Sequence, residues 1–548
     1  MKGTGFGRPW ALPLVVALGG LLSGLLVFLL APEAEGHGTG AAIEAFHEKG
    51  GRIRARIPPI KLIASAITIG SGGSAGREGP TAQISAGFGS VLGDLLKLES
   101  NERRILVAAG IGAGIGAIFR APLGGAVLAA EILYLRELEI EALFPGLIAS
   151  IIGYSLFGSW AGFEPIFGSQ PGLGFSRPIE LIYYALLGII CGMVGILYAK
   201  VFYGTTDLFH HRVPLPRWAK PAIGGLLVGL LGLVIPGVLS TGYGWVQMGM
   251  DNRLLDIPLW MILLLPFAKI LATSLSIGSG GSGGIFGPGM VIGGMVGAAF
   301  WRLAYPLLPG MPAEPAPFTI IAMMALFGGI AHAPLAVMLM VAEMTGNLSL
   351  LAPAMIAVGL SSLVCGNRTI YRSQLPTRAD SPAHRYQFSF PLLTRLTVRE
   401  AMEASPLLLR PDAPIIEAKE RLMAHHLSGA SVAADDGHLL GVITLADIER
   451  APPAGGEPAL VRIVMTRELV TIEPEAGLDL ALEKLADNRI SWMPVVDGLE
   501  PVVVGTISAA DINRQYRLAL KRSGRRMRDI TVRGDGVSDQ SDQPIARP

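Results

Sequence analysis

The sequence predicts an all-α polytopic membrane domain with an inverted internal repeat and broken helices, followed by a smaller α/β pair of domains. Three observations lead to this fold class. Charged residues are scarce over the first two thirds of the chain, one glycine-rich phrase occurs twice there, and the charged C-terminal part contains a repeat of its own.

The composition favours a membrane protein. Only 16% of the 548 residues are charged, whereas soluble domains average about 25%. Residues 11–31, 270–301 and 344–366 form uncharged runs, and about 20 apolar residues suffice to cross a bilayer. Each run is therefore long enough to cross the membrane, and we interpret the first as a retained helix because it is longer than a signal-peptide core.

Charges become frequent from about residue 376. We therefore predict the following domains: a membrane domain at 1–375, a linker at 376–395, two small domains at 396–452 and 453–520, and a disordered basic tail at 521–548. The only cysteines, Cys191 and Cys365, lie in apolar segments, which disfavours a disulfide framework or a cysteine-rich metal site. The net charge of +1 gives no indication of a nucleic-acid partner.

The membrane domain contains two pairs of matching segments. "IGSGGSAGREGP" (69–80) returns as "IGSGGSGGIFGP" (277–288), 208 residues later. "FRAPLGGAVLAAE" ends at Glu131 and "AHAPLAVMLMVAE" ends at Glu343, 212 residues later. Two landmarks in the same order at nearly one offset indicate an internal duplication, and such repeats in membrane proteins are often inverted around broken helices.

The glycine-rich phrases favour an anion. Glycine permits the backbone to break a helix, and Pro80 and Pro288 suit the first turn of the helix that follows. The start of a helix presents free N–H groups and a positive dipole end, which attract negative charge. Close packing of glycines between helices is the alternative explanation.

The C-terminal part repeats "VREAM" (398–402) as "VRIVM" (461–465), and "GVITLADI" (441–448) as "GTISAADI" (505–512). Thr444 with Asp447, and Ser508 with Asp511, place a hydroxyl and a carboxylate three residues apart at a predicted strand-to-helix junction. A helix cap explains the hydroxyl, while the added carboxylate also suits a ribose diol. Both interpretations remain open.

These motifs resemble the CLC family of chloride channels and proton/chloride exchangers. "GREGP" (76–80) and "GIFGP" (284–288) are similar to two of its three signature motifs, and "GHGTG" (36–40) aligns with the third. The likeness covers about residues 9–375, the C-terminal pair resembles tandem CBS domains, and the chain begins near what would be the third helix of the family.

The resemblance implies roles for individual residues. Glu78 matches the gating glutamate, whose carboxylate competes with the anion, and a carboxylate at membrane depth is a functional candidate in its own right. Ile285 and Phe286 match the positions whose backbone N–H groups bind the anion, and Tyr371 matches the tyrosine whose hydroxyl closes that site. The resemblance also implies a homodimer in the plasma (inner) membrane with cytoplasmic CBS domains.

Two positions depart from the family pattern. The serine that helps to bind the anion aligns with His37, a doubtful ligand that could equally be a packed or interfacial histidine. The internal proton-transfer glutamate of the exchangers aligns with Ile132. Its neighbour Glu131 points about 100° away on a helix, so no proton relay is assigned.

We therefore expect transport of chloride or a similar monovalent anion, leaning to a voltage- or pH-gated channel, with proton-coupled exchange as the alternative. The CBS pair could take an adenine nucleotide at Thr444, Asp447, Ser508 and Asp511, and no other cofactor is expected. An enzyme is not expected: a CBS-containing intramembrane metalloprotease needs His-Glu-x-x-His, and the only His-Glu pair is His47-Glu48, without the second histidine. A cation transporter would need several acidic residues at membrane depth. The membrane portion has few of them, so this class is disfavoured.

Overall fold

A computed structural model describes residues 9–169, 172–175, 177–251, 253–384, 393–450, 459–498 and 501–519. They form two compact units, a membrane domain that ends at His384 and a C-terminal unit that begins at Leu393. The predicted tail 521–548 and part of the predicted linker, 385–392, lie outside the described residues.

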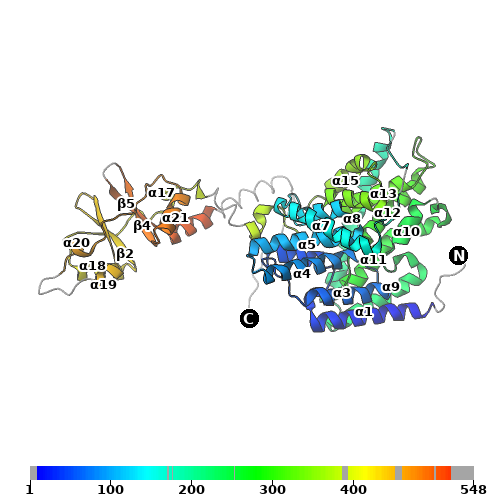
Figure 1. Cartoon of the computed structure of the whole chain (residues 1–548), viewed down its shortest axis with the longest axis horizontal. Helices are drawn as coiled ribbons and strands as arrows, with labels where there is room; N and C mark the ends of the chain where they lie inside the picture. The colour runs from blue at the N-terminus through cyan, green and yellow to red at the C-terminus, as the bar shows by residue number, and fades with distance from the viewer. Residues whose placement is uncertain are drawn as a thin grey trace. The chain divides into compact units, whose positions relative to one another are not determined.

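The described part of the membrane domain is helical, as predicted. Its helices are α1 (Ala11–Leu30), α2 (Thr39–His47), α3 (Ile57–Gly70), α4 (Glu78–Leu95), α5 (Ser100–Phe119), α6 (Pro122–Glu131), α7 (Ile140–Ala161), α8 (Glu180–His211), α9 (Lys220–Val234), α10 (Tyr243–Met250), α11 (Leu259–Gly278), α12 (Phe286–Ala304), α13 (Ala316–Ile330), α14 (Pro334–Thr345) and α15 (Leu351–Cys365). Within the described residues, five helical segments are long and apolar enough to cross a membrane: α1, α7, α8, α11 and residues 217–234, which include α9. Neighbouring helices such as α4 with α5, and α1 with α9, lie side by side (Figure 1).

Two of the three uncharged runs are not single helices, and in run 270–301 the break falls within the second glycine-rich phrase, as predicted. Run 270–301 is divided between α11 and α12, because the chain turns through Gly280 at a φ of 104°. Run 344–366 is divided between α14 and α15, where Gly346 ends α14 in the left-handed conformation. An absence of charge therefore identified the apolar environment, whereas glycines placed the helix ends.

The two halves of the domain match as the repeat predicts. Gly72, in the first phrase, adopts the same φ of 104° as Gly280 in the second. The carboxylate of Glu131 at the end of α6 accepts hydrogen bonds from N–H groups at the start of α14, and that of Glu343 near the end of α14 accepts them from the start of α6. This reciprocal exchange agrees with a two-fold relation between the halves, as expected for an inverted repeat.

The C-terminal unit is an α/β pair, as predicted. Its elements are α17 (Val398–Ala401), β1 (Leu408–Leu409), α18 (Ile415–Ala424), β2 (Gly429–Ala433), β3 (Leu439–Thr444), α19 (Leu445–Glu449), α20 (Val461–Val464), α21 (Leu478–Asp487), β4 (Trp492–Asp497) and β5 (Val502–Ser508). One sheet has the order β1-β2-β3, with β1 parallel to β2 and β2 antiparallel to β3, and β4 pairs with β5 in a second, antiparallel sheet. The amphipathic helices α18 and α21 bury their apolar faces in the cores of their own repeats.

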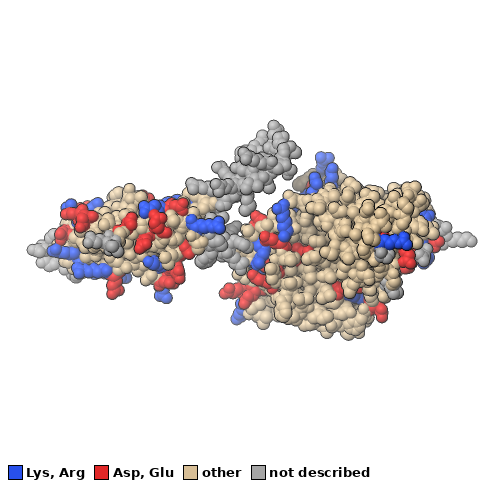
Figure 2. Space-filling model, turned by 90° about the horizontal axis from the view of Figure 1, so that it is seen from above, with Lys and Arg blue, Asp and Glu red and all other residues tan. Residues whose placement is uncertain are grey.

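The surfaces of the two units differ in the way the composition predicts. Figure 2 shows broad areas of the membrane domain without Lys, Arg, Asp or Glu, whereas acidic and basic side chains are spread over the C-terminal unit. Large apolar side chains stay exposed on membrane-domain helices, such as Phe144 on α7 and Leu363 on α15, which are 70% and 77% exposed. Apolar surfaces of this kind are favourable in contact with lipid and unfavourable in contact with water.

Candidate functional site

Three glycine-rich loops meet in the interior of the membrane domain. Gly76 and Gly284 pair in antiparallel fashion through two backbone hydrogen bonds of 2.8 and 2.6 Å. The loop that contains Gly36 pairs with the second phrase at Ser282. The contact requires glycine, since a Cβ atom at Gly79 would lie 2.2 Å from the His37 carbonyl oxygen. The three segments that resemble signature motifs are therefore in contact with one another.

Glu78, the first residue of α4, lies at this meeting point with its side chain fully buried. One carboxylate oxygen accepts a hydrogen bond from the Tyr243 hydroxyl, and the other accepts one from the Gly287 N–H at 3.2 Å. A Cβ atom at Gly76 would lie 2.1 Å from the carboxylate, and one at Gly287 would lie 2.7 Å from it. Both glycines leave the space that the carboxylate occupies.

Ile285 and Phe286 lie at the start of α12, the second broken helix. Backbone N–H groups at this position have no acceptor within the helix, and both side chains are almost fully buried. The Ile285 carbonyl accepts a hydrogen bond of 3.0 Å from the Tyr198 hydroxyl. The Phe286 ring packs against Phe327, with ring centroids 4.1 Å apart. Free N–H groups in apolar surroundings are suited to a dehydrated anion.

Tyr371 and His37 lie together, next to the aromatic side chains around α12. The Tyr371 ring centroid is 5.4 Å from that of His37 and 6.3 Å from that of Phe327. The Tyr371 hydroxyl is buried and has no hydrogen-bond partner of ordinary geometry in the part of the chain that the structure describes. The side chain of Thr39, at the start of α2, lies close to this hydroxyl. A buried hydroxyl without a firm partner can donate to a ligand.

The His37 side chain packs against Tyr371 and also lines a cavity. Its Nδ1 accepts a hydrogen bond of 3.3 Å from the Gly40 N–H, so the imidazole caps the start of α2 as a serine side chain could. The cavity beside it measures about 410 Å³ and includes Arg372 and His210 in its lining. The structure thus brings Glu78, Ile285, Phe286, Tyr371 and His37 to one region, and their roles stay predictions.

Ile132 and Glu131 differ sharply in their surroundings. The Ile132 side chain is fully buried and apolar. The Glu131 carboxylate is held by the N–H groups of Leu335 at 3.2 Å and Ala336 at 2.7 Å, in the first turn of α14. Glu131 is therefore engaged as a cap of α14, with both carboxylate oxygens occupied as hydrogen-bond acceptors.

Sequence reasoning missed three polar residues near the loops. Lys61 and Lys269 are fully buried, and each ammonium group donates to two backbone carbonyls, those of Ala34 and Gly36 for Lys61 and two from residues 238 and 240 for Lys269. They are 208 residues apart, the same offset as the glycine phrases, and that offset could have identified them. Tyr243, which contacts Glu78, has no comparable signal in the sequence.

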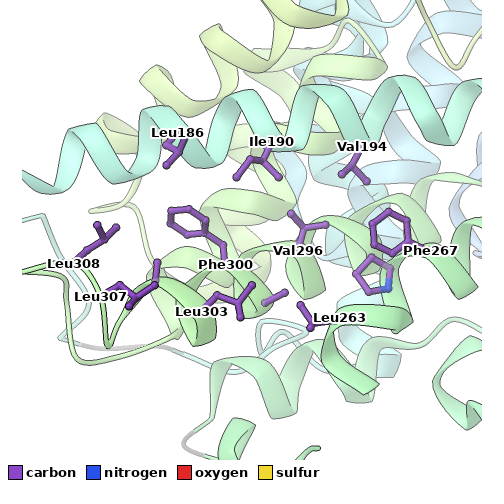
Figure 3. Close-up of a pocket in the computed structure, with 13 residues that line it drawn as sticks. Leu186, Ile190, Val194, Leu263, Phe267, Val296, Phe300, Leu303, Leu307 and Leu308 are labelled. Carbon is purple, nitrogen blue, oxygen red and sulfur yellow. The ribbon is translucent and has the colours of Figure 1, made fainter. Parts of the chain in front are cut away.

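A second cavity in this domain lacks polar character. It measures about 390 Å³ and lies between α8, α11 and α12, with a lining of apolar side chains such as Leu186, Phe267 and Phe300 (Figure 3). It offers no side-chain hydrogen-bond donor to an anion. Among the described residues, no group of three His, Cys, Asp or Glu side chains could hold a metal ion.

The repeated hydroxyl–carboxylate pairs of the C-terminal unit form capping boxes. Thr444 caps α19, and its N–H and hydroxyl donate to Asp447 Oδ2 at 2.9 and 2.6 Å. Ser508 and Asp511 have the same arrangement, at 3.0 and 2.6 Å. The first pair lines a cavity of about 360 Å³ and the second a cavity of about 550 Å³, with Trp492 in the lining of both. The cap interpretation is confirmed, and Asp511 Oδ1 is also paired with Arg514 at 2.8 Å.

Comparisons with known proteins agree with these observations. The family model described as "Voltage gated chloride channel" matches residues 19–366, and the CBS domain model matches 398–453 and 461–517. The "Putative chloride channel protein ClcB-like" of Ralstonia nicotianae is 33% identical over 354 residues, which cover 64% of this chain and 81% of the relative. The "H(+)/Cl(-) exchange transporter ClcA" of Citrobacter koseri is 33% identical over 380 residues, covering 66% and 78%.

A solved structure is similar in fold. The crystal structure of "a slow cyanobacterial Cl-/H+ antiporter" matches with a TM-score of 0.59 at 27% identity, over 67% of this chain and 86% of that one. The family match spans more than half of the chain and contains the loops around Glu78. The chain therefore belongs to the CLC family of chloride channels and proton/chloride exchangers, and it carries a tandem pair of CBS domains.

Proposed function

We propose that the protein moves chloride or a similar monovalent anion across the membrane through a pathway gated by Glu78, in exchange for protons. One observation carries the proposal most directly. The buried Glu78 carboxylate lies at the facing starts of two broken helices and accepts a hydrogen bond from the Gly287 N–H of the second. The negatively charged carboxylate occupies a place where the helix-start N–H groups could bind a free anion instead.

The surroundings support an anion as the substrate. The N–H groups at the start of α12 and the buried Tyr371 hydroxyl are donors, and the positive end of the α12 dipole points at the same region. Lys61 and Lys269 add two buried amino groups to the walls of the loops. In this mechanism Glu78 leaves its position when it takes up a proton, because neutral glutamic acid is held less strongly by these donors.

Proton exchange has more support than the passive channel to which the sequence leans. The relative from Citrobacter koseri is named as an H⁺/Cl⁻ exchange transporter, and the similar solved structure is titled a Cl⁻/H⁺ antiporter. A titratable carboxylate that also occupies the anion pathway can couple the two ions, because anion and proton then act on the same group.

A second candidate is passive anion flow, and Ile132 favours it. An isoleucine cannot carry a proton, and Glu131 beside it is committed to the start of α14. Exchange therefore requires a proton route to Glu78 that bypasses position 132. The pathway for the anion is the same in both candidates.

Purified protein in sealed liposomes distinguishes the two candidates. With a chloride gradient imposed and the voltage clamped by an ionophore, an exchanger moves protons uphill at a fixed ratio to chloride, whereas a channel moves none. Glu78→Gln imitates the protonated gate, so we expect anion flux without proton movement and without pH dependence. Wild-type pH dependence in this variant would exclude Glu78 as the gate, and wild-type protein without anion flux would exclude the proposed function.

We further propose a homodimer with one pathway per subunit, in the plasma (inner) membrane of the cell with its CBS domains in the cytoplasm; the family resemblance supports these proposals. For the CBS pair we propose an adenine nucleotide, with its ribose at Asp447 or Asp511. Asp447 is the better candidate because one oxygen of Asp511 is already paired with Arg514. Each carboxylate lines a cavity, of about 360 Å³ at Asp447 and about 550 Å³ at Asp511.

A further inference from the structure

The Glu78 carboxylate is held by a side chain that the glycine motifs do not contain. The Tyr243 hydroxyl donates a hydrogen bond to one carboxylate oxygen, while the Gly287 N–H occupies the other. An ionised carboxylate is an acceptor only, and a phenol is a donor to it. A hydrogen bond to an ionised group is roughly twice as strong as one between neutral groups.

The position of Tyr243 is set by the same phrase that carries Glu78. Tyr243 begins α10 directly after Gly242, which turns the chain at a φ of 85°. Just before this turn, the Ser240 N–H donates to the Gly72 carbonyl at 3.3 Å, and the Ser240 hydroxyl donates to the Ile69 carbonyl at 3.0 Å. The Lys269 ammonium group donates to the Ser240 carbonyl at 2.7 Å. These bonds hold the start of α10 against the first glycine phrase.

Tyr243 approaches Glu78 from the side of the loop that follows α7. Its ring packs edge-on against Phe167 in that loop, with centroids 5.5 Å apart. α7 begins at Ile140, next to Glu141, which pairs with Arg378 shortly before the end of the membrane domain. The 22 residues of α7 separate that end from the loop by about 33 Å. The loop that Tyr243 contacts therefore follows the end of α7 that is distant from Arg378.

We propose that Tyr243 is a positioning residue that latches the gate: its hydroxyl holds the ionised Glu78 carboxylate in the pathway, so that the gate opens slowly and only at more acidic pH. The inference rests on the proposed function of Glu78. Because the latch acts on the charged form of the carboxylate, protonation weakens it and releases the side chain. The anion then enters the space that the carboxylate leaves beside Gly76 and Gly287.

The test is chloride flux from liposomes between pH 4.5 and 8 with Tyr243→Phe, which removes one oxygen atom and keeps the ring on Phe167. We expect flux at neutral pH to rise about tenfold, and the pH of half-maximal flux to move about one unit upward, since one hydrogen bond to a charged group is worth about a factor of ten or more. Tyr183→Phe is the matched control. It removes a buried tyrosine hydroxyl that donates to the Pro309 carbonyl, far along the chain from the gate, and its flux profile should equal that of the wild type.

The combination of Tyr243→Phe with Glu78→Ala distinguishes a latch from a tyrosine that only stabilises the fold. Without a carboxylate, adding Tyr243→Phe should leave flux and its pH profile unchanged. The same change in both backgrounds, or a wild-type profile in Tyr243→Phe alone, overturns the proposal. If Tyr243→Phe does not fold, Tyr243→Met tests the same bond, because it also removes the hydroxyl while its flexible apolar side chain fills the space of the ring. A wild-type pH profile in that variant also overturns the proposal, whereas failure of the proposed function would appear as wild-type protein without anion flux.

Discussion

Replacing Glu131 by alanine should destabilise the membrane domain without changing how it couples ions. The carboxylate accepts hydrogen bonds from the Leu335 N–H at 3.2 Å and the Ala336 N–H at 2.7 Å, and the side chain is 6% exposed. Alanine would leave two N–H donors at the start of α14 without an acceptor, one of them buried and the other partly buried. The loss of one hydrogen bond to a charged group costs about 1.5–3 kcal/mol, and the removal of a charge at a helix start costs up to about 2 kcal/mol.

These contributions overlap, so we expect a loss of about 3 kcal/mol in the free energy of unfolding for Glu131→Ala. Glu131→Gln keeps one acceptor oxygen and loses the charge, and it should cost about half as much. Glu343→Ala is the matched variant in the other half, because Glu343 holds the N–H groups of Leu123 and Gly124 at 3.1 and 2.9 Å. It should cost a similar amount.

The assay is thermal unfolding of the purified protein in detergent, together with the ratio of protons to chloride in liposomes. A loss of about 3 kcal/mol lowers the unfolding temperature of a domain of about 375 residues by about 4 °C, on the scale of soluble domains. Glu131→Gln should retain the wild-type ion ratio. A changed ratio at unchanged stability would show that Glu131 carries protons rather than capping a helix.

Three further predictions concern coupling, the CBS pair and assembly. Ile132→Glu places a titratable group where the exchangers of the family have one, and it should raise the number of protons moved per chloride in the liposome assay; an unchanged ratio would mean that the proton route avoids this position. ATP, ADP or AMP should raise the unfolding temperature of the full chain, and Asp447→Ala should reduce that rise while Asp511→Ala reduces it less; no rise with any of the three would contradict nucleotide binding. The mass of the detergent-purified protein, corrected for bound detergent, should be that of two chains, and a monomer alone would contradict the dimer.

The sequence alone was sufficient for features that depend on local order. The repeated phrases predicted an internal duplication, and Gly72 and Gly280 share one backbone conformation because a glycine-rich stretch leaves few alternatives at a helix break. Thr444 and Ser508 were predicted as possible caps because a hydroxyl three residues before an acidic side chain forms a capping box in a single turn. Hydrophobicity also predicted helices around most of the apolar runs, since lipid forces the backbone to satisfy its own hydrogen bonds.

Contacts between distant segments were decided by tertiary structure. Run 344–366 breaks between α14 and α15, and neither a charge nor a repeated phrase marks that break in the sequence. The sequence indicates no partner for Glu131, whereas the fold places the start of α14 against its carboxylate, 204 residues along the chain. Tyr243 lies 165 residues from Glu78, and its hydroxyl reaches the carboxylate only because Ser240 and Lys269 hold the start of α10 against the first glycine phrase. A hydrogen bond acts over a few ångströms, so the partner of a buried charge depends on which distant segments folding brings together, and no spacing along the chain encodes that.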